Sequence, residues 1–397
     1  MMTSTYLPRQ IELGSNSLEQ LGKIAVENGA TKLFVVMDAF LATEGLNYDM
    51  KIKSIAKKEK LSVTIFSDYK GEPTTHHLHA ALDGLIKSKA DCVVAIGGGS
   101  AIDIAKAASV FAINPVLTWE EIVSQKRLKR LPLLAVPTTA GTGSEATKVM
   151  VVKNMETQIK MNPGHKDLVP DVAILDPLLT KSLPNQFTAY TGLDALAHAM
   201  EAYVSTLASA TTDNYALHAI RMIGKSLPKV YENGADVDAR EEMLLASCYA
   251  GIAFSNASTN LAHAAGRPLG ARFHIPHGLS VALLLPFVVE FGLEAAEDRY
   301  AAIAVSLGEE DTGNKKHLAK RTHKLIESYN DTFSIWEDAL RYIDLQDFKE
   351  SIPLLVDDAL SGNGIVTNPK VPESKDVEHI FNALLKKLTQ VAQIQMA

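Results

Sequence analysis

Cysteine is scarce in this sequence, and the two that occur cannot build a framework of cross-links. Cys92 and Cys248 are the only cysteines among 397 residues, and each lies in an apolar stretch. This count excludes a disulfide-stabilised scaffold and a zinc site made of cysteines. It is compatible with a reducing compartment, and we therefore expect a cytoplasmic protein.

An excess of basic charge and long apolar runs are also missing. The chain has 39 Lys and Arg against 46 Asp and Glu, a formal net charge of −7, whereas nucleic-acid-binding domains usually carry a basic surface. No stretch reaches the roughly 18 uncharged apolar residues that a membrane helix needs, and the first residues do not follow the pattern of a signal peptide. We expect no nucleic-acid partner and no membrane partner.

The length and the change of pattern along the chain indicate two domains. A single hydrophobic core stops growing at roughly 250–300 residues. From Thr31 to about Leu179, short β-branched runs alternate with helical stretches, which is typical of a mostly parallel sheet. After residue 183 the segments are rich in Ala, Leu and Met, with few strand-like runs. We predict an α/β dinucleotide-binding domain over residues 1–183 and an all-α domain over residues 184–397.

The periodicity of apolar residues gives the individual elements. The predicted strands are Lys32–Met37, Ser62–Phe66, Cys92–Ile96, Leu133–Val136 and Val172–Leu175. The predicted helices include Asn47–Glu59, His76–Ser88 and Ala101–Phe111 in the first domain, and Thr188–Ser205, Thr211–Val230, Ala239–Ser255 and Leu279–Gly292 in the second.

Three consecutive glycines follow one of these strands. The strand that ends at Ile96 runs into Gly97-Gly98-Gly99-Ser100, and a helix comes next. Glycines let a ligand approach the backbone, and the free N–H groups at a helix start suit a pyrophosphate. The pattern indicates a nucleotide site, although it is neither the Rossmann fingerprint nor a P-loop. The alternative is a tight strand-to-helix turn that binds nothing.

A second loop and one acidic residue strengthen the nucleotide hypothesis. Thr138, Thr139 and Thr142 lie in a loop rich in glycine and hydroxyl groups, directly after another strand. Such a loop can bind phosphate, ribose or the nicotinamide amide. Asp38 follows the strand that ends at Met37 and can accept hydrogen bonds from ribose hydroxyls while repelling a 2′-phosphate. The alternative for Asp38 is a helix cap.

One carboxylate and three histidines form a candidate metal site. Asp194 and His198 are four residues apart, which places them on one face of a helix, and Ala, Leu and Met surround them. An unpaired charge among apolar residues would be costly, so a shared cation is favoured over a surface or capped pair. His263 and His277 also lie in apolar or tight-turn surroundings. These four groups suit iron or zinc and leave room for a substrate oxygen, although their spacing does not give their distance in space.

These residues resemble the iron-dependent (group III) alcohol dehydrogenase family, and the resemblance covers nearly the whole chain. The matching stretches are Gly97–Lys106, Pro137–Glu145, Pro170–Pro177, Thr191–Ser205, Asn260–Gly278 and Thr367–Pro369. The resemblance implies an NAD(H)-dependent alcohol dehydrogenase or aldehyde reductase, a helical domain of the dehydroquinate-synthase-like type, and a homodimer or larger homo-oligomer.

The resemblance also implies roles for individual residues. Asp194, His198, His263 and His277 match the metal ligands, with Fe²⁺ expected and Zn²⁺ as the alternative. We expect contacts with the cofactor from Gly97, Gly98, Gly99, Ser100, Asp103, Thr138, Thr139, Thr142 and Lys160. Asp38 matches the acid associated with NAD preference, and Phe254 matches a position that lines the substrate pocket.

One position departs from the family pattern. Where members commonly carry a second histidine, four residues after the third ligand, this chain has Arg267. Arginine stays protonated and cannot act as a general base, so the route of the proton is open among a water chain, a ribose hydroxyl and His274. We place Arg267 and His277 in the catalytic site, with Arg267 and Phe254 contacting the substrate.

Arg267 also bears on the substrate. A guanidinium offers a fork for the oxygens of a carboxylate, sulfonate or phosphonate, which favours a short aldehyde with an anionic tail, such as sulfoacetaldehyde, succinic semialdehyde or phosphonoacetaldehyde. Equally, Arg267 can pair with a nearby acid or the cofactor's pyrophosphate. The alternatives are a reductase of small neutral aldehydes or diols of the lactaldehyde or propanediol type, a dehydroquinate-synthase-like lyase, and a non-catalytic protein that retains the fold.

Overall fold

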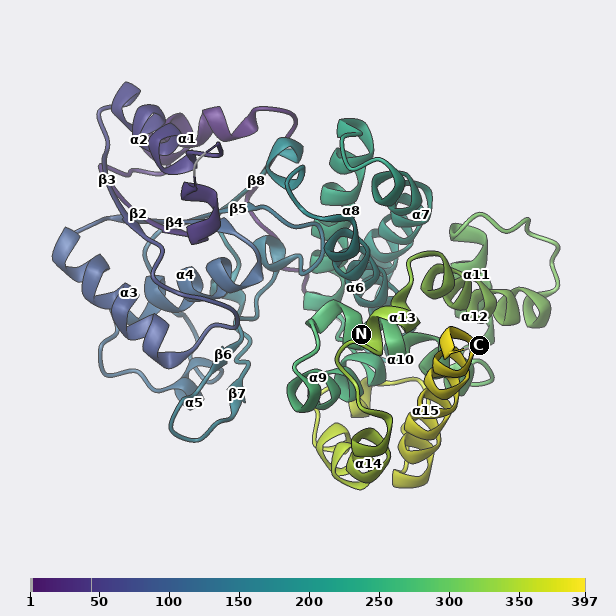
Figure 1. The fold of residues 1–397 in the computed structure, drawn as a ribbon. Coiled ribbons are helices and arrows are strands. Elements are labelled where there is room, and N and C mark those ends of the chain that lie inside the picture. The colour runs from purple at the N-terminus through teal and green to yellow at the C-terminus, as the bar shows by residue number, and fades with distance from the viewer. Residues whose placement is uncertain (1–2, 44, 397) are drawn as a thin grey trace. The chain divides into compact units, whose positions relative to one another are not determined.

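The computed structural model describes residues 3–43 and 45–396, and the chain divides into two compact units. One unit spans residues 6–182, and the other comprises residues 183–396 together with residues 3–5. The division lies at the change of sequence pattern near residue 183. Figure 1 shows strands and helices in the first unit and helices in the second.

The first unit contains a six-stranded parallel sheet with the order β1-β8-β5-β4-β2-β3. Its strands are β1 (Gln10–Leu13), β2 (Lys32–Met37), β3 (Ser62–Phe66), β4 (Cys92–Gly97), β5 (Leu133–Pro137) and β8 (Val172–Leu175). The five predicted strands are therefore present, two of them one residue longer than predicted. The strand β1 was not predicted; it has four residues and pairs with β8 from Gln10 opposite Val172.

Helices cover both faces of this sheet because its central strands are apolar on both sides. Phe34 and Val36 of β2 pack with α3 (Thr75–Ser88) and α4 (Gly99–Phe111) in one hydrophobic cluster. The alternate residues of β2 point to the other face, into a cluster with α1 (Leu21–Glu27) and α2 (Tyr48–Lys58). This two-sided burial explains why the central strands are nearly continuous apolar runs.

The remaining elements of the first unit are short. They include α5 (Trp119–Ile122), several 3₁₀ turns, and a two-stranded antiparallel hairpin of β6 (Val152–Lys153) and β7 (Lys160–Met161), which was not predicted. The helix α4 begins at Gly99, two residues earlier than predicted, so the glycine loop supplies its first residue.

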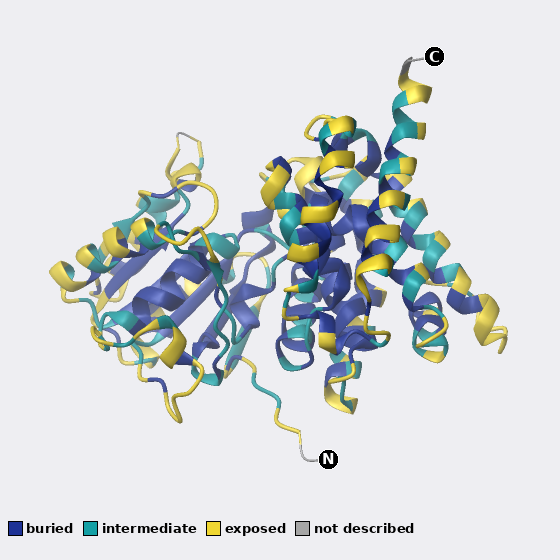
Figure 2. Ribbon diagram, turned by 90° about the horizontal axis from the view of Figure 1, so that it is seen from below, coloured by how far each residue is buried: buried dark blue, intermediate teal, exposed yellow. Residues whose placement is uncertain are grey.

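The second unit is helical, and its inner helices carry most of its buried residues (Figure 2). Its helices are α6 (Asn185–Val204), α7 (Ala210–Glu232), α8 (Val237–Asn256), α9 (Leu261–Phe273), α10 (His277–Gly292), α11 (Glu297–Ser306), α12 (Lys315–Thr332), α13 (Ile335–Ala339), α14 (Leu345–Leu360) and α15 (Ser374–Met396). None of the helices in the described residues has both the length and the apolar character needed to cross a bilayer. The predicted fold class, a parallel α/β domain followed by an all-α domain, is confirmed.

Candidate metal and nucleotide sites

Three loops of the first unit meet at the carboxyl ends of neighbouring strands. Asp38 follows β2, the glycine loop follows β4, and the threonine loop follows β5. The chain passes from β2 outward to β3 and then returns to β4 on the other side of β2, so the strand order reverses between β2 and β4. In open α/β sheets, ligands bind at the carboxyl ends of the strands beside such a reversal.

Asp38 lies against the glycine loop and does not cap a helix. Its carboxylate accepts a hydrogen bond from the Gly98 N–H at 3.0 Å and another from the Tyr69 hydroxyl at 2.5 Å. No side-chain capping bond is present at the 3₁₀ turn that follows it, within the described residues. A Cβ on Gly97 would lie 2.4 Å from the Asp38 Oδ2 atom, so the approach of this carboxylate requires glycine there.

The glycine and threonine loops are in direct contact. The Thr138 N–H donates to the Gly97 carbonyl at 3.0 Å. A Cβ on Gly98 would come within 3.7 Å of Thr139, and one on Gly99 would lie 3.0 Å from the Thr142 side chain. A ligand bound at the start of α4 therefore lies near backbone N–H groups and threonine hydroxyls together, as a pyrophosphate requires.

Asp103 joins α4 to the segment that follows the threonine loop. Its carboxylate accepts hydrogen bonds from the Ser144 hydroxyl at 2.7 Å and the Val151 N–H at 2.9 Å. The buried Lys106 ammonium lies 3.9 Å from the same carboxylate and donates to Ser144 and to Thr147. In this structure Asp103 thus binds protein groups, and its contact with the cofactor stays a prediction.

Lys160, another expected cofactor contact, belongs to the β6-β7 hairpin. Its ammonium pairs with the Glu72 carboxylate, in the loop before α3. The hairpin is joined to that loop by a bridge between Lys153 and Thr74. A contact of Lys160 with the cofactor therefore stays a prediction as well.

In the second unit, α6 carries two of the four expected metal ligands. Asp194 and His198 are both buried and lie one turn apart, with the His198 Nδ1 atom 3.9 Å from Asp194 Oδ2. The apolar residues of α6 pack against α7, α8 and α10, so the helix is buried on nearly all sides. The two polar side chains consequently lie in the interior of the unit.

The other two expected ligands approach Asp194 from different helices. His263, in the first turn of α9, places its Nε2 atom 3.3 Å from Asp194 Oδ1. His277, at the start of α10, places its Nε2 atom 3.7 Å from the same oxygen. Asp194, His263 and His277 can each present one donor atom such that all three atoms lie within 4.8 Å of one another. His198 lies beside this triad, with its ring stacked on His263 at 4.3 Å.

The unsatisfied atoms of this cluster fit a divalent cation. Asp194 Oδ1, His198 Nδ1 and His263 Nε2 are fully buried and make no hydrogen bond to any residue that the structure describes. Leaving such atoms without a partner costs about 1–3 kcal/mol each, and an ion accepting their lone pairs would remove that cost. One carboxylate and up to three imidazoles form an open ligand set suited to iron or zinc.

The electrostatics of the cluster set the protonation state of each expected ligand. Burial lowers the pKa of His198 to about 3, so its ring is neutral at pH 7. Burial opposes ionisation of Asp194, but the neighbouring imidazoles of His198, His277 and His263 hold its pKa below the ordinary value. Burial also opposes protonation of His263, yet the Glu201 and Asp194 carboxylates raise its pKa to about 9. Because a cation must displace that proton, metal affinity should increase with pH.

Sequence reasoning missed Glu201, which is buried on α6 and contacts His263. Its Oε2 atom lies 2.5 Å from His263 Nδ1. Glu201 follows Asp194 by seven residues and His198 by three, so helical periodicity already places all three side chains on one face of α6. That periodicity was the available signal.

Phe254 and Arg267 border the ligand cluster. The Phe254 ring, on α8, stacks on His198 at a centroid distance of 4.1 Å. A contact of Phe254 with the substrate stays a prediction. Arg267 follows His263 by one turn of α9 and therefore lies on the same side of that helix. Burial lowers the pKa of its guanidinium, and the Glu201 carboxylate partly offsets this effect. His274, the residue suggested for proton transfer, is exposed at the carboxyl end of α9.

Comparisons with known proteins match both units. The family model for iron-containing alcohol dehydrogenase matches residues 8–177, and the model for the C-terminal part of the Fe-containing alcohol dehydrogenase family matches residues 188–385. The chain is 45% identical over 299 residues to the probable alcohol dehydrogenase EutG of Escherichia coli (strain K12), and the match covers 74% of each chain.

Two solved structures extend the similarity over nearly the whole chain. A crystal structure of 1,3-propanediol oxidoreductase superposes with a TM-score of 0.91 at 30% identity, covering 97% of this chain and 100% of that one. A sulfoacetaldehyde reductase from Bifidobacterium kashiwanohense, crystallised with NAD⁺, superposes with a TM-score of 0.85 at 27% identity, covering 97% and 99% of the two chains.

Proposed function

Because this chain belongs to the iron-containing alcohol dehydrogenase family of alcohol and aldehyde oxidoreductases, we propose that it is an NAD(H)-linked reductase of a short aldehyde that uses one divalent metal ion, iron in the first place. The observation that carries the proposal is the convergence of Asp194, His263 and His277, from three helices, around buried atoms without hydrogen-bond partners.

The helical unit would hold the metal and the reacting oxygen. Asp194, His263 and His277 would bind the ion, with His198 completing the set, and Phe254 would exclude water on the His198 side. When bound, a divalent ion polarises a carbonyl oxygen and stabilises the negative charge that develops there during hydride addition, an effect of several kcal/mol.

The α/β unit would hold the nicotinamide cofactor. The start of α4 and the threonine loop supply backbone N–H and hydroxyl groups to the pyrophosphate. Asp38 faces the glycine loop with a carboxylate that would accept from ribose hydroxyls and repel a 2′-phosphate. This charge supports NAD(H) in preference to NADP(H).

Arg267 supports a substrate with an anionic tail. Arg267 lies one turn after His263 on α9, and burial lowers the pKa of its guanidinium. A guanidinium in a partly buried position binds carboxylate, sulfonate or phosphonate oxygens strongly. A solved sulfoacetaldehyde reductase of similar fold is consistent with this class of substrate. Arg267 stays protonated at neutral pH and therefore serves to bind the substrate, not to accept a proton.

A second candidate is a reductase of small neutral aldehydes or diols. The similarity to 1,3-propanediol oxidoreductase favours it, and so does the electrostatic interaction of Arg267 with Glu201, which can satisfy the guanidinium without a substrate anion. The two candidates differ in what Arg267 does, and this difference can be measured.

The test follows oxidation of NADH with sulfoacetaldehyde, succinic semialdehyde, phosphonoacetaldehyde and propanal. We expect at least one anionic aldehyde to exceed propanal in kcat/KM by a factor of ten or more, and Arg267→Ala to abolish that advantage. Arg272→Ala is the matched control, because Arg272 is an exposed residue of the same helix whose partner is Asp347. If the ratio of kcat/KM for the anionic aldehyde to that for propanal is the same in wild type and Arg267→Ala, the anionic-tail proposal is contradicted. The reductase of neutral aldehydes or diols then remains.

A further inference from the structure

Glu201 binds both the backbone and the ring of His263 with a single buried carboxylate. Its Oε1 atom accepts from the Ala262 N–H at 2.7 Å and the His263 N–H at 3.3 Å. These groups lie in the first turn of α9, whose N–H groups have no partner within their own helix. The Oε2 atom lies 2.5 Å from His263 Nδ1. One side chain of α6 therefore fixes both the start of α9 and the orientation of a ligand on it.

The connection between α6 and α9 continues through neighbouring amide groups. The Asn260 side chain donates to the Glu201 carbonyl at 2.9 Å, and the Thr367 hydroxyl donates to the Asn260 side chain at 2.9 Å. The Asn368 side chain accepts from the Leu261 N–H. The position of Glu201 relative to His263 is thus set from several directions.

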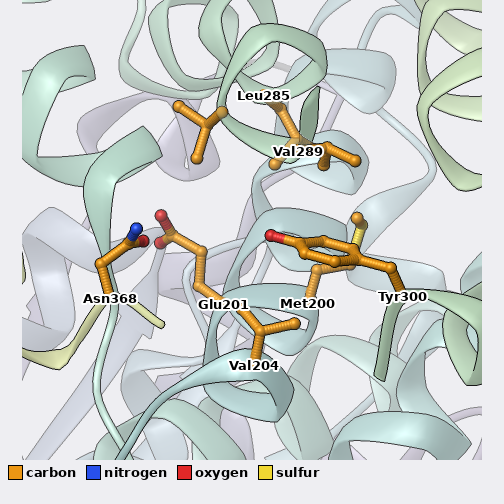
Figure 3. A pocket seen from close by; sticks show the side chains of 8 residues that line it. Met200, Glu201, Val204, Leu285, Val289, Tyr300 and Asn368 are labelled. Carbon is orange, nitrogen blue, oxygen red and sulfur yellow. The ribbon is translucent and has the colours of Figure 1, made fainter. Parts of the chain in front are cut away.

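A small cavity of about 10 Å³ lies beside Glu201 and is mostly apolar. Figure 3 shows the Glu201 carboxylate between Asn368 and the Tyr300 ring, with Val289 and Leu285 across from it. Such walls offer a carboxylate little competition from solvent, and a hydrogen bond in a low dielectric is strengthened. The hydrogen bonds of the Glu201 carboxylate are consequently made to groups of α9.

We propose that Glu201 is a positioning residue of the metal site, which holds His263 in the form that carries its proton on Nδ1. Nε2, 3.3 Å from Asp194 Oδ1, is then the ring nitrogen that would direct its lone pair at the proposed ion. This inference rests on the proposed metal site. Carboxylates that orient a ligating histidine in this way raise metal affinity by about 10- to 100-fold.

Glu201→Gln separates this role from simple packing because it preserves shape and removes one acceptor. If the glutamine oxygen faces the backbone N–H groups, its NH₂ group meets His263 Nδ1 and favours the ring form with the proton on Nε2. If the amide is reversed, its NH₂ group meets the N–H groups of Ala262 and His263. Either arrangement loses an interaction that the carboxylate makes.

The experiment titrates metal-free wild type, Glu201→Gln and Glu201→Asp with Zn²⁺ in competition with a fluorescent chelator, alongside urea unfolding and NADH titration. We expect Glu201→Gln to bind Zn²⁺ 10- to 100-fold more weakly, with its urea midpoint and NADH affinity near those of wild type, and its turnover to recover at high metal concentration. Asp338→Asn is the control, since it removes a charge equally buried in the same unit that contacts Tyr190.

The outcomes distinguish the two levels of the proposal. Wild type that binds no Zn²⁺ contradicts the proposed function itself. Wild type that binds one Zn²⁺, with unchanged affinity in Glu201→Gln, contradicts only the role of Glu201. If Glu201→Gln does not fold, Glu201→Asp decides, because a shorter carboxylate cannot reach Nδ1 and both N–H groups together. A folded Glu201→Asp with wild-type metal affinity overturns the inference.

Discussion

The backbone at Gly278 passes so close to Tyr190 that a Cβ there would lie 2.2 Å from the Tyr190 carbonyl oxygen. The neighbouring residue, His277, is the first of α10, and Asp194 lies one turn after Tyr190 on α6. This close approach of α10 and α6 is what brings the His277 ring to within reach of the Asp194 carboxylate.

Gly278→Ala should therefore move α10 away from α6. The added methyl meets backbone that cannot rotate away, so we expect a loss of about 2 kcal/mol or more in the free energy of unfolding, together with loss of bound metal. Urea unfolding and metal analysis measure the two effects. Gly164→Ala is the control, because its Cβ makes an ordinary contact of 3.6 Å with Val149. Full metal content in Gly278→Ala would refute the role of this contact.

Removing single ligands should separate turnover from cofactor binding. His263→Ala and His277→Ala each delete one of the converging imidazoles while leaving the loops of the α/β unit intact. We expect aldehyde reduction to fall by at least 100-fold, with the NADH dissociation constant within about threefold of wild type. Stopped-flow turnover and NADH fluorescence titration give these values. Near-normal turnover in either variant would mean that the residue does not bind the catalytic ion.

Asp38 should determine the choice between the two nicotinamide cofactors. Asp38→Ser removes the negative charge beside Gly98, so the repulsion of a 2′-phosphate disappears. We expect the ratio of kcat/KM for NADPH to that for NADH to rise tenfold or more. Tyr69→Phe is the matched control, since it removes a hydrogen bond to Asp38 and retains the charge. A ratio that is the same in Asp38→Ser and wild type would contradict this assignment.

The buried Glu145 should make stability depend on pH. Burial raises the pKa of this carboxyl from 4.5 to about 7, with a backbone hydrogen bond and Lys106 opposing the shift, and its Oε1 atom has no hydrogen-bond partner in the described part of the chain. Between pH 4.5 and 7 the folded chain holds a proton that the unfolded chain has lost. Raising the pH through this window therefore favours the unfolded state.

Glu145→Gln should remove that loss of stability. We expect the free energy of unfolding of the variant, relative to that of wild type, to increase by up to about 3 kcal/mol as the pH increases from 5 to 8. Urea midpoints at both pH values measure it, and Glu294→Gln, at an exposed position, is the control. A constant difference between variant and wild type would show that Glu145 has the same pKa in both states.

The central strands and most helices could be predicted because burial on one or both faces leaves a periodic pattern of apolar residues. The edge strand β1 could not, since Gln10–Leu13 is too short for a pattern and acquires its structure from pairing with β8. The loops around Gly97 and Thr138 could be singled out as a candidate nucleotide site because glycine and hydroxyl residues directly follow strands.

The metal cluster could be predicted from the sequence only in part. Local spacing related Asp194 to His198, but no local pattern joins α6 to α9 and α10. The prediction that His263 and His277 approach Asp194 therefore came from the family resemblance. Helical periodicity places Glu201 on the same face of α6 as Asp194 and His198, but its contacts with α9 are tertiary and the sequence does not display them. Homo-oligomerisation and a cytoplasmic location stay predictions.

Anaerobic titration of metal-depleted protein with Fe²⁺, followed by NADH oxidation in the presence of aldehyde, tests the central claim most directly. We predict that activity is absent without metal, rises linearly with added ion and reaches its maximum at one ion per chain. Full activity in the metal-free protein, or an unchanged titration after loss of His263, would contradict the account.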